Sequence, residues 1–155
     1  MIAKAPSSKA RRLPKRATPK PKVARLKSSS DPVAPELVLL SRTKGTPDRG
    51  GGPGGEAWKI EVGGQRAGIV FINQIDEPPV GRHASIQIYL NKPNQGRHIG
   101  RVAYRKACEA SSYDEIYAHM RKSNLASRRA AEEAGFEVDL RPGAAQLLMR
   151  WTRKP

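Results

Sequence analysis

The sequence predicts an α+β fold, in which a mixed and mostly antiparallel sheet packs against two helices. Segments with the two-residue alternation of strands recur between residues 36 and 90. Two segments with helical spacing follow, at residues 99–110 and 125–134, and each leads into a further strand pattern. Hairpins pair neighbouring strands antiparallel, whereas a helix between two strands lets them run parallel. The two kinds of connection together predict a mixed sheet covered by helices.

The sheet should begin with a strand and a long loop. Residues 36–43 form the first predicted strand. Residues 44–56 contain six glycines and two prolines, a composition that favours a flexible loop without a helix. The run from Gly50 to Gly55 formally fits a dinucleotide-binding glycine motif, but it contains a proline and precedes a strand where that motif needs a helix.

Three strands and two turns are expected next. Residues 58–62 and 66–75 should pair as a hairpin, because Gly63-Gly64 between them is a typical two-residue turn. Residues 76–79 should end the second strand of this hairpin, since they include two prolines. Residues 84–90 alternate cleanly and form the next predicted strand.

The second half of the domain should alternate helices with strands. A short buried strand at residues 115–119 separates the helices at 99–110 and 125–134, and residues 136–140 and 146–152 should close the sheet as an antiparallel pair. The first helix is expected to bury one face, made of Ile99, Val102, Ala103, Lys106, Ala107 and Ala110. The second is expected to bury a stripe of Leu125, Ala126, Ala130 and Ala134.

The charge is distributed unevenly. Residues 1–30 hold ten basic residues and no acidic one, so they carry ten of the fifteen net positive charges. A segment rich in Lys, Arg, Pro and Ser buries too little apolar surface to offset its ordering entropy. Residues 1–34 are therefore expected to be a disordered basic arm, and residues 35–155 one folded domain. Two interpretations of residues 1–30 stay open: non-specific contact with nucleic acid or the ribosome, since they are cationic and have no aromatic residue to stack on bases, or a solvated tail of incidental charge.

Several classes of protein are excluded. No apolar run approaches the 18 to 20 residues that span a bilayer, and the amino terminus lacks the apolar core of a secretory signal. The single cysteine, Cys108, rules out an intramolecular disulfide and a cysteine-rich zinc site, and no metal is expected. A reducing, cytoplasmic compartment fits this cysteine content.

A turn at residues 94–100 joins a predicted strand to a predicted helix. The first N–H groups of a helix lack intrahelical partners, and the helix dipole adds partial positive charge there. Arg97 and Arg101 flank this turn and could add charge-assisted hydrogen bonds. The turn is suited to a diphosphate, although an ordinary strand–helix connection with solvated arginines would have the same sequence.

A second strand–helix turn lies about thirty residues further on, in the segment N-L-A-S-R-R-A-A-E-E-A-G-F from Asn124 to Phe136. The first turn has Gln95 and Gly100 at the first and sixth positions of (R/Q)-x-x-G-x-(G/A), and the second has Asn124 and Ser127 in N-x-x-(A/S). Together the two turns resemble the acetyl-coenzyme A site of the GNAT acetyltransferase superfamily. The form of the second motif is most similar to the branch that acetylates ribosomal-protein amino termini and some antibiotics.

This resemblance implies acetyl-CoA as the cofactor and a role for each matching residue. The outer strand would contact the pantetheine arm and the thioester carbonyl, the first turn would hold the pyrophosphate, and Asn124 would contact the pantetheine. Ser127 would lie near the sulfur and protonate the departing thiolate. The implied cofactor-binding residues are Ile88, Tyr89, Leu90, Gln95, Gly96, Arg97, His98, Ile99, Gly100, Arg101 and Asn124.

The general base is less well defined. Many relatives carry a Glu on the strand before the first turn, where this chain has Ser85. The titratable groups that remain for this task are His83, Asp76, Glu77 and His119. His83 is taken as the candidate catalytic base beside Ser127, since a base must lie within hydrogen-bond reach of the amine.

The chain departs from the superfamily pattern in three further ways. His98 replaces the usual Gly of the first turn, and Ala131 stands where many relatives have a proton-donating Tyr. The glycine-rich loop at 44–56 replaces two helices that wall the acceptor site in relatives. The acceptor side should therefore be open, or completed by a partner. That would suit a bulky acceptor, such as a protein terminus or a lysine tail, and also a protein that has lost catalysis.

Three functions fit these observations. The first is an N-acetyltransferase that moves an acetyl group from acetyl-CoA to a primary amine. The second is a catalytically inactive GNAT-like interaction module, tethered to nucleic acid by its basic arm. The third is a small basic nucleic-acid-binding protein unrelated to acetyl transfer. In each case no membrane contact is expected.

Overall fold

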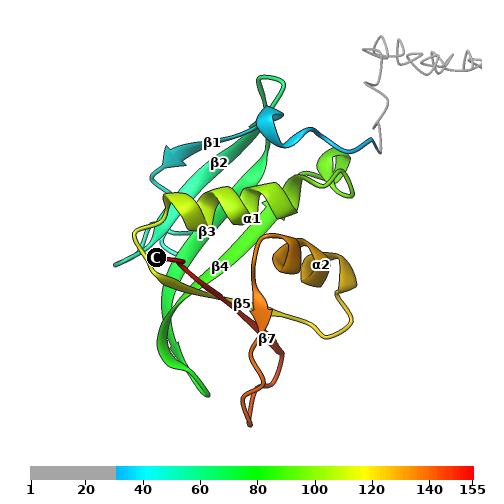
Figure 1. Ribbon diagram of the computed structural model, residues 1–155. Helices are drawn as coiled ribbons and strands as arrows, with labels where there is room; N and C mark the ends of the chain where they lie inside the picture. Colours follow the sequence, from blue (N-terminus) through cyan, green and yellow to red (C-terminus); the bar gives the residue numbers. More distant parts are fainter. Residues whose placement is uncertain (1–30) are drawn as a thin grey trace, which may run out of the picture.

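Seven strands form one sheet, and two helices cover one of its faces (Figure 1). This arrangement comes from a computed structural model that describes residues 31–155. Residues 1–30 of the predicted arm at 1–34 lie outside the described residues. The strand order is β1-β2-β3-β4-β5-β7-β6, and only the β4–β5 pair is parallel. The predicted α+β class and mixed sheet are confirmed.

The elements follow the predicted order. The strands are β1 (Val38–Thr43), β2 (Glu56–Val62), β3 (Gln65–Glu77), β4 (Gly81–Leu90), β5 (Glu115–Met120), β6 (Glu137–Val138) and β7 (Leu147–Thr152). The helices are α1 (Ile99–Ala110) and α2 (Leu125–Glu133), with single 3-10 turns at η1 (Pro35–Leu37) and η2 (Lys92–Asn94). Gly63 and Gly64 both have positive φ, 60° and 76°, which is the backbone of a type I′ turn, so the predicted β2–β3 hairpin turn is confirmed.

Several strand boundaries differ from the prediction by one to three residues, and β2 and β4 begin earlier than expected, at Glu56 and Gly81. The first strand starts at Val38, because the preceding Pro35–Leu37 segment closes a 3-10 turn. The predicted break at 76–79 is also too early, since Asp76 pairs with Arg82 and Glu77 with Gly81 before the turn. Polar residues are tolerated at this end of the hairpin because their side chains face solvent, and only the two prolines, which lack an N–H, stop the pairing.

The helices also correct parts of the predicted buried faces. In α1, Ala110 is exposed, whereas Tyr104 and Cys108 are buried. In α2, Leu125 is 58% exposed and Ala126 is exposed. The side chains that α2 buries are Ala131, Ala134 and, in part, Ala130. The cause is that α2 packs on α1 as well as on the sheet, and this contact selects a different stripe of the helix.

The face of the sheet opposite the helices is crossed by the loop between β1 and β2. This loop has no helix, as predicted. The Gly50 N–H donates to Asn73 Oδ1 of β3 at 2.8 Å, and the Asn73 amide donates to Asp48 O at 2.7 Å. Gly50 has a φ of 79°, and a Cβ there would collide with the Glu56 carbonyl, so only glycine fits. The Arg49 guanidinium lies over the Tyr89 ring at 4.7 Å.

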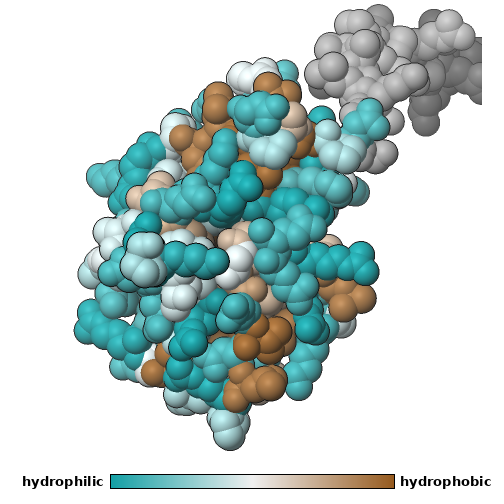
Figure 2. Space-filling view, viewed as in Figure 1, coloured by the Kyte–Doolittle hydropathy of each residue, from teal (hydrophilic) through white to brown (hydrophobic). Residues whose placement is uncertain are grey.

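The main core lies between the sheet and the helices. Side chains of β2 to β5, β7 and α1 fill it, and a smaller cluster of Ala57, Ile69 and Phe71 lies on the opposite face. Val33 is buried in the main core and its N–H donates to Arg97 O. Figure 2 shows that the surface on the helix side is mostly hydrophilic, with apolar side chains in separate groups. None of the helices within residues 31–155 has the length and apolar character needed to cross a membrane.

Candidate functional site

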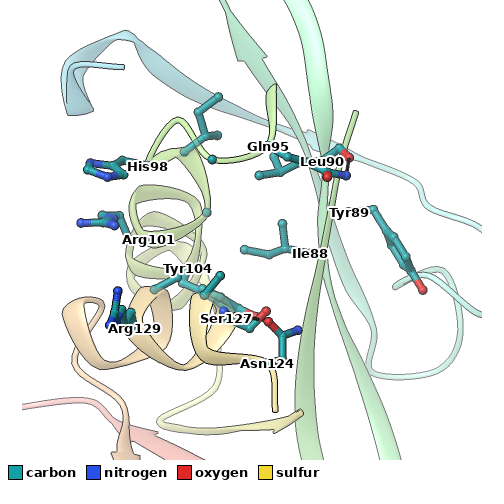
Figure 3. A pocket seen from close by; sticks show the side chains of 15 residues that line it. Ile88, Tyr89, Leu90, Gln95, His98, Arg101, Tyr104, Asn124, Ser127 and Arg129 are labelled. Atoms are coloured by element: carbon teal, nitrogen blue, oxygen red, sulfur yellow. Dashed lines mark hydrogen bonds between the residues drawn. The ribbon is translucent and has the colours of Figure 1, made fainter. Parts of the chain in front are cut away.

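The strands β4 and β5 separate from one another shortly after they meet. Their ladder consists of one residue pair, Ser85 with Tyr117, although β4 continues to Leu90 and β5 to Met120. A cleft of about 550 Å³ lies beyond this pair, bounded by β4 and the first turns of α1 and α2 (Figure 3). We call it the β4–β5 cleft. Its lining residues are Ile88, Tyr89, Leu90, Gln95, Gly96, His98, Ile99, Gly100, Arg101, Tyr104, Asn124, Ala126, Ser127, Arg129 and Ala130.

Every residue that the sequence assigns to cofactor binding lines this cleft, with one exception. Arg97 does not line it. Its Nε donates to Asp31 O at 3.2 Å and a terminal nitrogen donates to Asn94 Oδ1 at 3.2 Å. Arg97 therefore holds the segment that enters the domain around Val33. Ser127 also lies in the cleft, whereas His83 does not.

Four lining residues were not foreseen: Tyr104, Ala126, Arg129 and Ala130. Helical spacing could have predicted two of these residues, Tyr104 and Ala130. Tyr104 follows Gly100 by four residues, and Ala130 follows Ser127 by three, so each lies one turn further along the same face. Burial raises the pKa of Tyr104 to about 12, which keeps its hydroxyl protonated at neutral pH.

The start of α1 presents backbone N–H groups at the end of the cleft. His98 caps this helix in the left-handed conformation, with φ 64° and ψ 14°, and no side chain caps the first turn. The first N–H groups of α1 therefore lack an acceptor within the helix. The Gln95 amide donates to Leu90 O at 3.1 Å and closes the turn. Gly96 also has a positive φ, 74°, so the backbone reverses tightly before the helix.

Arg101 supplies a second reason to expect an anionic ligand. Its guanidinium forms an ion pair with Glu133 of α2. Its Nε atom, however, is buried and has no hydrogen-bond partner among the described residues. Buried donors are almost always paired in folded proteins, so an unpaired one in a cleft suits a ligand with acceptor oxygens. In the view of Figure 3, His98, Arg101 and Arg129 line one side of the cleft.

Gly100 leaves space between the two helices and β4. A Cβ built on Gly100 would lie 4.0 Å from Ala130 Cβ and 4.0 Å from Leu90 Cδ1, which is ordinary contact distance. At the other side of the cleft, Asn124 caps α2, since its Oδ1 accepts from the Ser127 N–H at 3.1 Å. Asn124 and Ser127 lie together opposite Ile88 (Figure 3).

His83 lies on the other face of β4. Alternation directs Ile86, Ile88 and Leu90 towards the helices, and His83 and Ser85 away from them. His83 is 6% exposed. Both of its ring nitrogens are engaged, Nδ1 with Gly81 O at 2.7 Å and Nε2 with His119 Nε2 at 2.8 Å. His83 therefore has no nitrogen left for a substrate.

The left-handed conformation of His98 leads to a testable prediction. A residue with a Cβ pays about 1 kcal/mol in this region relative to glycine. His98→Gly should therefore raise the free energy of unfolding by about 1 kcal/mol, as measured by urea denaturation. Gly96→Ala is the matched control, because a Cβ there meets nothing within 4 Å and only the φ of 74° penalises it. It should lower the same free energy by about 1 kcal/mol. Equal free energies of unfolding for the parent, His98→Gly and Gly96→Ala would contradict the inferred backbone strain at His98.

The sheet, the split between two parallel strands and the anion site at a helix start define a class of acyl-transfer domain. A family model described as "Acetyltransferase (GNAT) domain" matches residues 17–137. The chain belongs to this GNAT acetyltransferase family, and the resemblance inferred from the two turns is confirmed. No curated protein matches the chain.

Solved structures have the same fold. A Mycobacterium smegmatis RimJ, solved with CoA-disulfide, aligns with 22% identity and a TM-score of 0.50, over 63% of this chain and 53% of its own. A GNAT acetyltransferase from Streptococcus agalactiae aligns with 11% identity and a TM-score of 0.55, over 64% and 66%. An aminoglycoside acetyltransferase, solved with coenzyme A and kanamycin, aligns with 20% identity and a TM-score of 0.53, over 64% and 67%. The chain thus spans about half to two thirds of the length of these proteins.

Proposed function

We propose that the protein transfers an acetyl group from acetyl-CoA to a primary amine on a bulky acceptor, such as a protein terminus or a lysine tail. The observation that carries the proposal is the β4–β5 cleft, which ends at an uncapped helix start beside the unpaired Nε of Arg101. Coenzyme A bound by the RimJ and aminoglycoside acetyltransferase structures supports the choice of cofactor.

The cleft offers partners for the pyrophosphate, the pantetheine arm and the sulfur of acetyl-CoA. Backbone N–H groups at 98–101 and the Arg101 guanidinium would hold the pyrophosphate. The backbone of β4 at 88–90 has no partner strand on the β5 side, where only Leu90 O is occupied, by the Gln95 amide. Its remaining groups would bind the amides of the pantetheine arm, beside Asn124. When bound, acetyl-CoA supplies an activated acetyl group as a thioester. Ser127 would hydrogen-bond the sulfur and return a proton to it.

The open face supports a bulky acceptor. Only the loop at 44–55 lies between β1 and β2, and it binds close to β3 through Asn73. No helix within the described residues covers this face. A protein segment could therefore reach β4 and β5 without the walls that enclose a small acceptor. The similarity to the ribosomal-protein branch, the contact of residues 1–30 with nucleic acid and a cytoplasmic location remain predictions from the sequence.

A catalytically inactive interaction module is the second candidate, and Ala131 favours it. The position seven residues after Asn124 often holds a proton-donating Tyr in relatives, but here Ala131 is fully buried in the core and cannot donate a proton. The hydroxyl groups on the helix side of the cleft belong to Ser127 and Tyr104, because the Tyr89 ring stacks on Phe71 on the opposite face of the sheet. The proposal of an active enzyme therefore depends on one of these hydroxyls.

The first experiment is a calorimetric titration of the full chain with acetyl-CoA, followed by an assay of free thiol release. We expect micromolar binding, and turnover with peptides that carry a free amino terminus or a lysine. Kanamycin should be a poorer acceptor. Binding without turnover on any amine would favour the inactive module, and absence of binding at millimolar acetyl-CoA would contradict the cofactor site.

Ser127→Ala tests the proposed proton donor. A hydrogen bond to a developing thiolate is worth roughly 1.5–3 kcal/mol, so kcat should fall about 10- to 100-fold. The Kd for CoA should stay within about threefold, because Asn124 bonds the backbone of residue 127 and not its hydroxyl. Ser123→Ala, at an exposed position just before Asn124, is the matched control and should leave kcat unchanged. Equal kcat for both variants would remove Ser127 from the mechanism.

A further inference from the structure

Two histidines face each other on the helix-free side of the sheet, where β4 and β5 meet. His83 comes from β4 and His119 from β5, 36 residues later in the chain. Their Nε2 atoms are 2.8 Å apart. The His83 ring also packs edge to face with the Tyr117 ring, and the two ring centroids are 5.1 Å apart. Nothing in the proposed binding of acetyl-CoA uses this pair.

Hydrogen-bond chemistry fixes the protons of the pair when both rings are neutral. The Gly81 carbonyl can only accept, so Nδ1 of His83 carries the proton that it donates at 2.7 Å. The Nε2 of a neutral His83 is then an acceptor, and Nε2 of His119 must carry the proton between them. It follows that Nδ1 of His119 has a free lone pair. A carbonyl and one imidazole thus orient a second imidazole as a base.

His119 is accessible where His83 is not. His119 is half-buried, whereas His83 is 6% exposed. Within residues 31–155, no group hydrogen-bonds to Nδ1 of His119, and this atom is not among the fully buried ones. Nδ1 of His119 therefore contacts solvent, as a group that takes a proton from a substrate must.

His119 does not line the β4–β5 cleft but lies on the other face of the sheet, near the point where β4 and β5 separate. Ser85 and Tyr117 form the one ladder pair of β4 and β5, and His119 is two residues beyond Tyr117, on the edge of the gap that opens there. Ile116, Ala118 and Met120 point to the helices, so His119 points to the helix-free face. An amine that enters from that face towards the end of the cleft passes His119.

We propose that His119 is the general base for the acceptor amine, and that His83 is the residue that positions it. This inference rests on the proposed acetyl transfer. Nδ1 of His119 takes one proton from the ammonium group of the acceptor. The neutral nitrogen then forms a bond to the acetyl carbon as the carbon–sulfur bond breaks, and the second nitrogen proton goes to the leaving thiolate through Ser127. The products are the amide, free thiol and a protonated His119, which loses its proton to solvent.

The charges around His119 suit this role. Burial lowers the pKa of His119 below its usual 6.5, the neighbouring His83 lowers it further, and Glu77 of β3 acts in the opposite direction. His119 is therefore neutral at pH 7 and able to accept a proton. The kcat/KM should accordingly be constant near neutral pH and fall on the acid side of 6.5, as His119 becomes protonated in the free enzyme.

The test compares four proteins: the full chain, His119→Ala, His83→Leu and His83→Gln. Each is assayed for acetyl transfer to a short peptide with a free amino terminus, and for CoA binding by calorimetry. His119→Ala should lose about 100-fold or more in kcat/KM, together with the acid limb of the pH profile. Its Kd for CoA should stay within about threefold. His83→Leu should lower kcat/KM and shift the acid limb, and His83→Gln, which can still donate to Gly81 and accept from His119, should recover most of the loss.

A second measurement does not depend on turnover. Long-range proton–nitrogen NMR spectra of the full chain report which ring nitrogen carries the proton. We expect the proton on Nε2 of His119 and on Nδ1 of His83. The proton on Nδ1 of His119, or a His119→Ala variant that keeps kcat/KM within threefold of the parent, would overturn the proposal while acetyl transfer stands. A parent protein that binds CoA but acetylates no amine would overturn the proposed function itself, and the role of His119 with it.

Discussion

Gly100→Trp is expected to weaken acetyl-CoA binding by more than 100-fold. Gly100 lies in the first turn of α1, between Leu90 of β4 and Ala130 of α2. The space between Gly100 and these two side chains is large enough for a methyl group but not for a larger one. An indole there must extend into the β4–β5 cleft, next to the N–H groups assigned to the pyrophosphate. Calorimetric titration of the full-length variant with acetyl-CoA measures the effect.

Gly100→Ala is the control for this experiment. Its methyl group would lie 4.0 Å from both neighbours, and alanine is the better helix former, so the Kd should stay within threefold and the stability should not fall. A folded Gly100→Trp protein that binds acetyl-CoA as well as the parent would remove the anion site from residues 95–101. Loss of binding in both variants would point to a disturbed helix start and not to a filled cleft.

Glu56→Ala is expected to lower the free energy of unfolding by about 3 kcal/mol. Glu56 begins β2 and is 7% exposed. It accepts a hydrogen bond from the Ser111 hydroxyl, two from the N–H and hydroxyl of Ser112 at 3.1 and 3.2 Å, and pairs with Arg42 at 3.5 Å. Removing the carboxylate leaves the buried Ser111 hydroxyl without its acceptor and ends the hydrogen bonds of the exposed Ser112, which together should cost about 3 kcal/mol.

Urea denaturation of paired variants measures this loss. Glu56→Gln keeps the shape and one acceptor oxygen, so it should lose about half as much. Glu36→Ala, at an exposed position in η1, should change the free energy of unfolding by less than about 0.5 kcal/mol. A loss below 1 kcal/mol in Glu56→Ala would show that water replaces the carboxylate, and that the link between β2 and the end of α1 contributes little.

Features set by neighbouring residues could be predicted from the sequence. Gly63-Gly64 requires a turn because of its backbone freedom, and the spacing of Ile99, Val102 and Ala103 requires a helix that buries them. The turn around Gly100 was found for the same reason, since a short motif places all of its parts. The residues at both ends of the β4–β5 cleft could therefore be predicted from the local sequence patterns of two strand–helix turns.

Features set by contacts between distant segments could not be predicted. The hydrogen bond from His119 to His83 joins residues 36 apart, and no local pattern records that β4 and β5 place them together. The local sequence predicts Arg97 as a charge-assisted donor of the turn at 95–101, but the Arg97 Nε donates to the carbonyl of Asp31, 66 residues earlier. The buried stripe of α2 was misplaced because it depends on how α2 lies against α1. The sequence gives each helix a set of apolar residues, and the neighbours decide which of them are buried.

Because only one residue pair joins β4 and β5, the sheet has a third unpaired edge in its interior, in addition to its two outer edges. Beyond Ser85, the peptide groups of β4 that face β5 have no partner strand, just as those at the outer border of β1 do. An outer border can join the strand of another protein and so begin aggregation. The inner one opens onto the β4–β5 cleft, which the first turns of the two helices bound. A thin, extended ligand with amide groups can lie there, and it would complete the sheet as an inserted strand does.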